Sequence, residues 1–312
     1  MGNAKFARFA WVTLGYTVAV VLWGAIVRAT GSGAGCGESW PLCNGQLVFG
    51  TPSLAKIIEF THRFSTGVDG ALVLIMVVWS RRAFPKGHPA RFGAGLTVPF
   101  LVAEALIGAA LVKYGLVVND PSPARAVVLS IHQANTLALV GSIALTAWWG
   151  AGNKRVRWDG RAWITLAGLI ALSITGTLSA LADTLFHAPS LAEGLAQDWS
   201  AGANWLVHLR ALHPFLALAV GLWIVYYASS RMREARCGAL AAMALVAAQI
   251  AAGVLNLALL TPLSTQIIHL LLADALWISV LLLCEYDRPP AGRWAEGPGF
   301  IRAAKGSRQT AD

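Results

Sequence analysis

The chain has 312 residues, of which 56% are hydrophobic and only 12% are charged, and its mean hydropathy is +0.61. This composition excludes an ordinary soluble domain and indicates an integral membrane protein in contact with lipid. The formal charge of +9 does not indicate nucleic acid as a partner, because the basic residues lie in short segments between apolar runs, as the topology of membrane proteins requires.

Eight apolar runs are long enough to cross a bilayer, whose hydrocarbon core of about 30 Å needs roughly 20 residues of helix. The sequence therefore predicts an all-α membrane protein with eight transmembrane helices. The predicted helices cover residues 9–29, 56–80, 94–118, 127–149, 162–182, 205–229, 238–260 and 266–284.

Lys and Arg residues set the expected orientation of these helices. If both termini are cytoplasmic, 18 of the 24 Lys and Arg residues fall in cytoplasmic segments, as the positive-inside rule requires. We therefore expect a multi-pass protein of the cell membrane with both termini in the cytoplasm. The six exceptions fall at or near the outer ends of helices and are Arg28, Lys56, Arg63, Lys113, Arg125 and Arg210.

The first helix is followed by a loop that holds two cysteines. The first run is about 20 residues long, and RATGSGAGC offers no convincing small-x-small cleavage site behind a short apolar core. We therefore expect this run to stay as a helix rather than be removed as a signal peptide. On the oxidising side of the membrane, Cys36 and Cys43 are expected to form a disulfide. This bond either stabilises the loop as a structural disulfide or accepts electrons from a neighbouring redox site. Cys237 and Cys284, at cytoplasmic helix ends, are expected to remain thiols.

The second, fourth, sixth and eighth helices each carry a histidine in their first turns, at a similar depth near the outer face. Zinc prefers four N or S donors at one point, whereas one histidine on each of two facing helices brackets a planar macrocycle. An ionisable group inside a membrane is costly unless it faces the bundle interior or a cofactor. We therefore expect two haem sites, with iron ligands His62 and His132 in one and His213 and His269 in the other.

His208 is an alternative to His213 in the sixth helix. The two residues are five positions apart, about 140° around a helix, so they cannot both face one site. The internal repeat described below and Pro214, which suits a helix start, favour His213.

The outer rim of the predicted haem sites also holds several cations. Haem propionates are anionic and would bind arginine there, although snorkelling towards lipid headgroups explains any one of these arginines equally well. The candidate propionate partners are Arg28, Arg63, Arg125 and Arg210.

Glu59 lies three residues before His62 on one helix face, and Asp69 continues the polar stripe. The equivalent positions of the sixth helix are mostly apolar, so we expect one reactive site and one electron-transfer site. An oxidation needs a nearby proton acceptor, and Glu59 is the candidate for this role. Alternatively, Glu59 is an interfacial carboxylate paired with Lys56 or Arg63.

A weak internal repeat relates the two halves of the chain. Because each half has four helices, the two copies run in the same direction through the membrane. The sequence therefore predicts two parallel-repeat four-helix bundles, residues 1–150 and 151–288, followed by a basic cytoplasmic tail, residues 289–312. The aligned pairs are Gly24 with Gly176, His62 with His213, Gly108 with Gly253 and His132 with His269.

Taken together, these motifs resemble those of the haem A synthases, membrane enzymes that convert haem O into haem A for terminal oxidases. The resemblance covers essentially the whole chain. GCGESWPLCNG matches the family's first outer-loop cysteine motif, and IIEFTHR matches its Glu-x-x-His-Arg motif. SIHQAN, LRALHP and IIHLLLAD occupy its remaining histidine positions.

The resemblance implies an oxidoreductase that oxidises the C8 methyl group of haem O to a formyl group through a hydroxymethyl intermediate. It implies that His62 and His132 hold the iron of the substrate haem O, whereas His213 and His269 hold that of a prosthetic haem B. Glu59 and the disulfide would lie beside the reacting haem. The haem O synthase and an electron donor or acceptor protein are the implied partners.

The sequence departs from the family pattern at two places. Residues 183–204 lack the second cysteine pair that many relatives have, and the His-Arg dipeptide of the second helix is replaced by His213 and Pro214 in the sixth. Arg210 could replace the missing arginine from the preceding turn.

Two other classes of function use the same features. A di-haem b cytochrome that passes electrons, for example from quinol, would use the same histidines but gives no role to Glu59 or the disulfide. A transporter would account for Asp69, Glu104 and Asp274 within the membrane spans. Four histidines near one face do not, however, form a path across the membrane.

Overall fold

The structure is a computed structural model that describes residues 2–45 and 51–286, so the predicted tail, residues 289–312, lies outside the described residues. The elements are helices of very different length. Their bounds are α1 Ala4–Ala29, η1 Ser32–Ala34, α2 Leu54–Ala83, α3 Pro89–Lys113, α4 Pro123–Gly150, α5 Gly160–Leu185, α6 Leu191–Asp198, α7 Trp205–Arg210, α8 Leu212–Ser230, α9 Arg236–Ala258 and α10 Leu263–Cys284.

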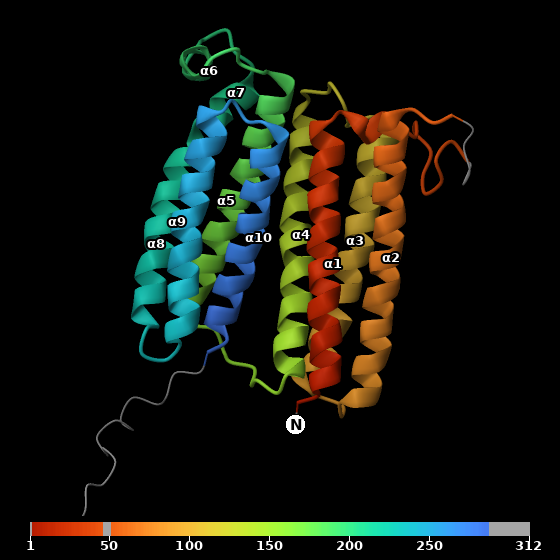
Figure 1. Ribbon diagram of the computed structural model, residues 1–312, viewed down its shortest axis with the longest axis vertical. Helices are drawn as coiled ribbons and strands as arrows, with labels where there is room; N and C mark the ends of the chain where they lie inside the picture. The colour runs from red at the N-terminus through yellow and green to blue at the C-terminus, as the bar shows by residue number, and fades with distance from the viewer. Residues whose placement is uncertain (1, 46–50, 287–312) are drawn as a thin grey trace, which may run out of the picture.

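Within the described ranges, eight helical spans are long and apolar enough to cross a membrane. The prediction of an all-α, multi-pass membrane protein with eight transmembrane helices is confirmed. Seven spans are single helices, and the sixth, Trp205–Ser230, consists of α7 and α8. The loop after α1, together with α6 and α7, lies at one end of the molecule, at the top of Figure 1. We call this the disulfide end.

The sixth span is interrupted at Ala211, between α7 and α8. Pro214 explains the break, because proline lacks an N–H and its ring clashes with the carbonyl group four residues earlier, that of Arg210. The interruption places His208 and His213 on two separate helices.

The predicted third helix, residues 94–118, was wrong by five residues at each end, since α3 covers Pro89–Lys113. It starts early because the His88 side chain accepts a hydrogen bond from the N–H of Ala90, and Pro89 suits the first helical position. It ends before Gly115, whose positive φ of 65° leaves the helical conformation. The apolar residues after Lys113 belong to the following turn.

The first four long helices pack around a common interior. α1 contacts α2 and α4, and α3 contacts the same two helices, so α2 and α4 lie on a diagonal. In the other group α5 contacts α8 and α10, and α9 contacts the same two, which places α8 and α10 on a diagonal. Figure 1 shows the two groups standing side by side. The sequence repeat and the domain boundaries at residues 150 and 288 stay predictions.

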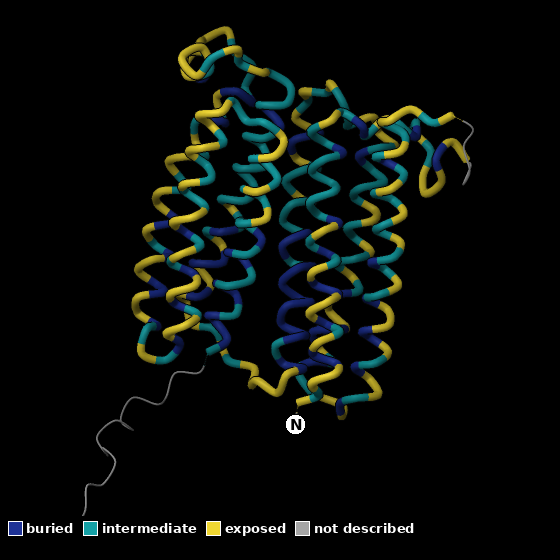
Figure 2. Tube along the Cα trace, viewed as in Figure 1, coloured by how far each residue is buried: buried dark blue, intermediate teal, exposed yellow. Residues whose placement is uncertain are grey.

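The two groups meet along α4, which packs against α5 and α10. Trp277 of α10 donates its indole N–H to the carbonyl oxygen of Leu137 at 2.9 Å. At Gly141 a Cβ atom would lie 3.1 Å from Leu281 and 3.3 Å from Trp277, so the glycine allows close packing. The buried residues of α4 gather from Thr136 to its end, and Figure 2 shows this buried half away from the disulfide end.

Glu285, at the end of α10, forms hydrogen bonds with the end of α4 and with the linker between α4 and α5. Its carboxylate is 3% exposed and accepts hydrogen bonds from the indole N–H groups of Trp149 and Trp158 at 2.8 and 2.7 Å. The backbone N–H of Val156 donates a third at 3.3 Å. One carboxylate thus connects the end of α10 with the end of α4 and the linker that follows it.

We predict that Glu285→Ala lowers the free energy of unfolding by about 2 kcal/mol or more, because it leaves buried N–H donors without acceptors. Thermal unfolding of the detergent-solubilised protein checks this. Glu193→Ala removes an exposed carboxylate of α6 and serves as the control. Equal unfolding temperatures for the two variants would contradict the assignment.

Candidate functional site

The four predicted histidines lie at a similar depth below the disulfide end. His62 is the ninth residue of α2 and His132 the tenth of α4, while His213 is the ninth of its span and His269 the seventh of α10. At 1.5 Å per residue these positions are about 9–14 Å from the start of each span. His62, His132 and His269 are therefore deeper than the predicted first turns, because α2, α4 and α10 begin earlier than the apolar runs indicate. The sixth span begins where predicted, and His213 lies in the first turn of α8.

Three of the histidines lie against a glycine of a neighbouring helix. A Cβ atom built on each glycine would lie 2.9–3.1 Å from the ring carbon Cε1, so only glycine leaves room for the imidazole. The fourth histidine, His132, has no such neighbour at Gly108. The contacting pairs are Gly24 with His62, Gly176 with His213 and Gly253 with His269.

His213 and His269 face each other across the second group of helices. Their ring centroids are 6.4 Å apart and their planes are inclined at 86°. With metal–nitrogen distances of about 2 Å, two imidazoles on opposite sides of one iron have their centres about 6 Å apart. His208 does not join this pair, because its Nδ1 lies 2.9 Å from the carbonyl oxygen of Asp198.

The surroundings of this pair are neutral. Nδ1 of His213 lies 3.2 Å from the hydroxyl of Thr175, and Nε2 of His269 lies 3.3 Å from the side-chain amide of Gln249. Nδ1 of His269 is buried without a hydrogen-bond partner among the described residues. The hydrogen-bond partners of each ring determine which of its two nitrogen atoms carries the proton. A buried imidazole nitrogen with no protein partner suits a ligand atom of a metal.

His62 and His132 occupy the diagonal helices α2 and α4. Nδ1 of His62 is also buried without a hydrogen-bond partner in the described residues. Nδ1 of His132 lies 3.2 Å from Oε1 of Glu104 on α3. No group of three or more His, Cys, Asp or Glu side chains with metal-site geometry occurs in the described ranges, so histidine pairs fit this protein better than a zinc cluster.

Both oxygens of Glu59 are engaged at the disulfide end of α2. Oε1 accepts from Arg63 at 2.5 Å, and Oε2 accepts from the backbone N–H of Cys36 at 2.7 Å. Arg63 in turn donates to the carbonyl oxygens of Ser39 and Leu42. Glu59 is 3% exposed, so this ion pair is shielded from water. Of the two alternatives for Glu59, pairing with Arg63 is present, and the role of proton acceptor stays a prediction.

The predicted disulfide between Cys36 and Cys43 is confirmed, and both cysteines are fully buried. Glu59 and Arg63 hold the two sides of its loop against α2. Cys237 and Cys284 are free thiols, as predicted. Whether the disulfide exchanges electrons stays a prediction.

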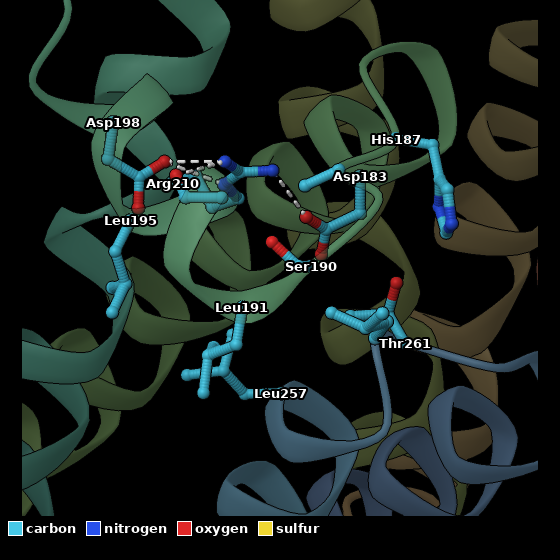
Figure 3. A pocket seen from close by; sticks show the side chains of 12 residues that line it. Asp183, His187, Ser190, Leu191, Leu195, Asp198, Arg210, Leu257 and Thr261 are labelled. Carbon is cyan, nitrogen blue, oxygen red and sulfur yellow. Dashed lines mark hydrogen bonds and ion pairs between the residues drawn. The ribbon is translucent and has the colours of Figure 1, made fainter.

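The four arginines near the rim fall into two classes. Arg63 and Arg210 already bind carboxylates, and Figure 3 shows Arg210 between Asp183 and Asp198 at a cavity of about 40 Å³. Arg28 crosses between the helix groups and donates to two oxygens of α5, at Ala180 and Thr184, and to Gln266 of α10. Arg125 is 3% exposed and donates to the carbonyl oxygens of Val118 and Asp120.

The hydrogen bonds of Arg28 and Arg125 thus go to neutral acceptors in the described part of the chain. An anionic ligand could form charge-assisted hydrogen bonds with these two guanidinium groups without displacing a carboxylate. Among the four candidates, Arg28 and Arg125 therefore remain the better propionate partners.

Sequence reasoning missed the partners of the histidines. Glu104 was noted only as a carboxylate in a membrane span, although an isolated acid in an apolar helix is itself a signal of a polar site. Thr175 and Gln249 carried no signal, because a hydroxyl or amide in an apolar helix is common and the approach of α5 to α8 was not predictable.

Proteins of known families share this sequence pattern. The chain matches the family model COX15-CtaA, described as "Cytochrome oxidase assembly protein", over residues 7–55 and 51–281. A "Protoheme IX farnesyltransferase" of Thermus thermophilus is 44% identical over 291 aligned positions, and the alignment covers 90% of this chain and 48% of that protein. The chain therefore spans about half the length of this relative.

Shorter matches occur with proteins named "Heme A synthase". The one from Bacillus licheniformis is 39% identical over 126 residues, 40% of this chain and 39% of that protein. The one from Geobacillus kaustophilus is 45% identical over 107 residues, 34% of each chain.

We predict that Arg63→Met exposes the disulfide, because the loop loses its hydrogen bonds from the guanidinium group and Glu59 loses its ion pair. A membrane-impermeant reductant should then cleave Cys36–Cys43 several times faster, since exchange depends on access to the sulfur. Quantification of labelled thiols over time measures this. Lys113→Met, at an exposed position of the same end, should leave the rate unchanged. A wild-type rate in Arg63→Met would contradict the anchoring role.

We also predict that His213→Ala and His208→Ala differ in haem content, because only His213 faces His269. Pyridine haemochrome assays of the purified proteins should show loss of one haem in His213→Ala and none in His208→Ala. Wild-type haem content in His213→Ala would mean that His213 is not an iron ligand.

Proposed function

The chain belongs to the COX15-CtaA family of cytochrome oxidase assembly proteins, and we propose on that basis that it acts as a haem A synthase. The observation that carries the proposal is the anchoring of a disulfide loop on Glu59 and Arg63, directly above His62 in α2. A carboxylate accepts protons and a disulfide accepts electrons, so these two groups beside a histidine suit an oxidation next to a bound haem.

The substrate site is proposed to lie between α2 and α4. His62 and His132 would hold the iron of haem O from opposite sides, at a depth where α4 is only partly buried by protein. The partly exposed interior at this level is consistent with a large planar ligand. Arg28 and Arg125 would bind propionates at the rim.

His213 and His269 are proposed to hold haem B in the second group of helices. Their centroid distance of 6.4 Å already suits a shared iron. When bound, haem B would supply one-electron transfer. Thr175 and Gln249 hold the two rings in place, and Gly176 and Gly253 leave room for them.

The proposed reaction converts the C8 methyl group to a hydroxymethyl group and then to a formyl group. As a half-reaction, the methyl group and one water molecule give the formyl group, four protons and four electrons, so protons must leave the reacting carbon and the electrons pass to an accepting protein. Glu59 is the proposed proton acceptor, and Arg63 orients its carboxylate. The two histidines would hold the ring in one position, which limits where its methyl groups lie relative to this carboxylate.

The proposed surroundings follow from the topology and from the relatives. We place the protein in the cell membrane with both termini cytoplasmic and the haem sites toward the outer face. In the Thermus relative, a region similar to this chain makes up about half of a polypeptide named for protohaem IX farnesyl transfer. We therefore propose that this chain works beside the enzyme that makes haem O, with a further protein accepting or supplying electrons.

One observation favours a second function, that of a di-haem b cytochrome. Both oxygens of Glu59 are occupied by Arg63 and Cys36, which is also what a purely structural carboxylate would show. Such a cytochrome would bind two haems and modify neither.

Haem extraction from cells that make haem O but lack haem A separates the two functions. With wild-type protein we expect haem A or its hydroxymethyl precursor on HPLC, and with Glu59→Gln we expect bound haem without product. Glu193→Gln, in an exposed carboxylate of α6, should behave as wild type. If wild-type protein holds reducible haem B while haem O passes unchanged, the cytochrome function replaces the synthase.

A further inference from the structure

A compact polar cluster surrounds Glu104 where α3 packs against α4. The hydroxyl of Thr136 donates to Oε1 at 2.5 Å, and the amide of Asn135 donates to Oε2 at 2.6 Å. Asn135 also donates to the carbonyl oxygen of Phe100 at 2.9 Å, which fixes the amide. The carboxylate is therefore held in one orientation by two side chains of the helix that carries His132.

His132 is the remaining neighbour of this carboxylate. Its Nδ1 lies 3.2 Å from Oε1, but the two atoms are not aligned for a hydrogen bond. The terminal torsion of a histidine side chain is soft, so a modest rotation of the ring brings the Nδ1–H group into line. With Nδ1 directed at Glu104, Nε2 is the nitrogen left to face the bundle interior.

The other three histidines have different partners. His213 has a hydroxyl, that of Thr175, and His269 has an amide, that of Gln249. His62 has no hydrogen-bond partner at Nδ1 in the described residues. Among these contacts, the anionic acceptor occurs at His132. The two proposed haem sites therefore differ in the charge behind their ligands as well as in the groups beside them.

We propose that Glu104 is the positioning residue of the substrate site: it accepts the Nδ1–H of His132, aims Nε2 at the iron of haem O and increases the electron donation of this ligand. This inference rests on the proposed function. A metal-bound histidine commonly donates its second N–H to a carboxylate, which fixes the ring and raises its basicity. An anion behind the ligand stabilises the more oxidised iron, which lowers the reduction potential of this site relative to the haem B site.

The test compares Glu104→Gln with wild type after both have been loaded with haem O. We expect haem O to dissociate about tenfold more readily from the variant, the size typical for loss of a carboxylate behind a ligating histidine. Spectroelectrochemical titration should show a higher reduction potential for the haem O signal and an unchanged one for haem B. Wild-type values for both affinity and potential would overturn the proposal.

Two further variants serve as a control and as a substitute in this test. Asp274→Asn removes a buried carboxylate elsewhere, on α10, and should leave the haem O values unchanged. If Glu104→Gln does not fold, Glu104→Asp keeps the charge but withdraws the carboxylate from His132, and it should shift the potential in the same direction by a smaller amount. An unshifted potential in a folded Glu104→Asp protein would also count against the proposal.

His132→Ala distinguishes failure of this inference from failure of the proposed function. If His132→Ala retains haem O at wild-type affinity, the substrate site itself is misplaced and the proposed function loses its basis. If His132→Ala loses haem O but Glu104→Gln keeps the wild-type affinity and reduction potential, the substrate site is supported and only the proposed role of Glu104 is wrong.

Discussion

The structure depends on one constraint, which is that a charged side chain within a membrane span needs a polar partner inside the protein. Asp69 meets it through the hydroxyl of Thr17 at 2.8 Å, and Glu104 through Thr136 and Asn135. Each pair joins two different helices. The polar contacts thus fix which helices are neighbours, while the apolar residues, equally soluble in lipid and in the core, leave that choice open.

The same constraint makes the two helix groups unequal. In the first, acidic side chains pair with polar groups around the histidines, as Glu104 does beside His132. In the second, Arg210 binds Asp183 and Asp198 at the disulfide end, and the histidines below have neutral neighbours. A carboxylate next to the histidines suits a site that moves protons, and neutral neighbours suit a site that only exchanges electrons. The proposed division of roles therefore follows from the side chains next to each histidine pair.

Much of the fold could be predicted because hydropathy and helix length are properties of local sequence. The eight spans and the disulfide were predicted, since each depends on residues close together in the chain. The shift of α3 and the break before His213 came from capping by His88 and from Pro214, which a count of apolar residues overlooks. The pairing of His132 with Glu104 joins two helices, and no pattern within either helix fixes how they are rotated against each other.

The contacts of Glu59 bear on how activity data are interpreted. The carboxylate proposed to lie beside the reacting haem also holds the disulfide loop, through the backbone N–H of Cys36 and through Arg63. Replacing Glu59 therefore removes the proposed proton acceptor and loosens the loop in one step. Replacing Arg63 loosens the loop while leaving the carboxylate. A loss of turnover shared by both variants would assign the effect to the loop or to the orientation of the carboxylate, whereas a loss confined to the Glu59 variant would assign it to proton transfer.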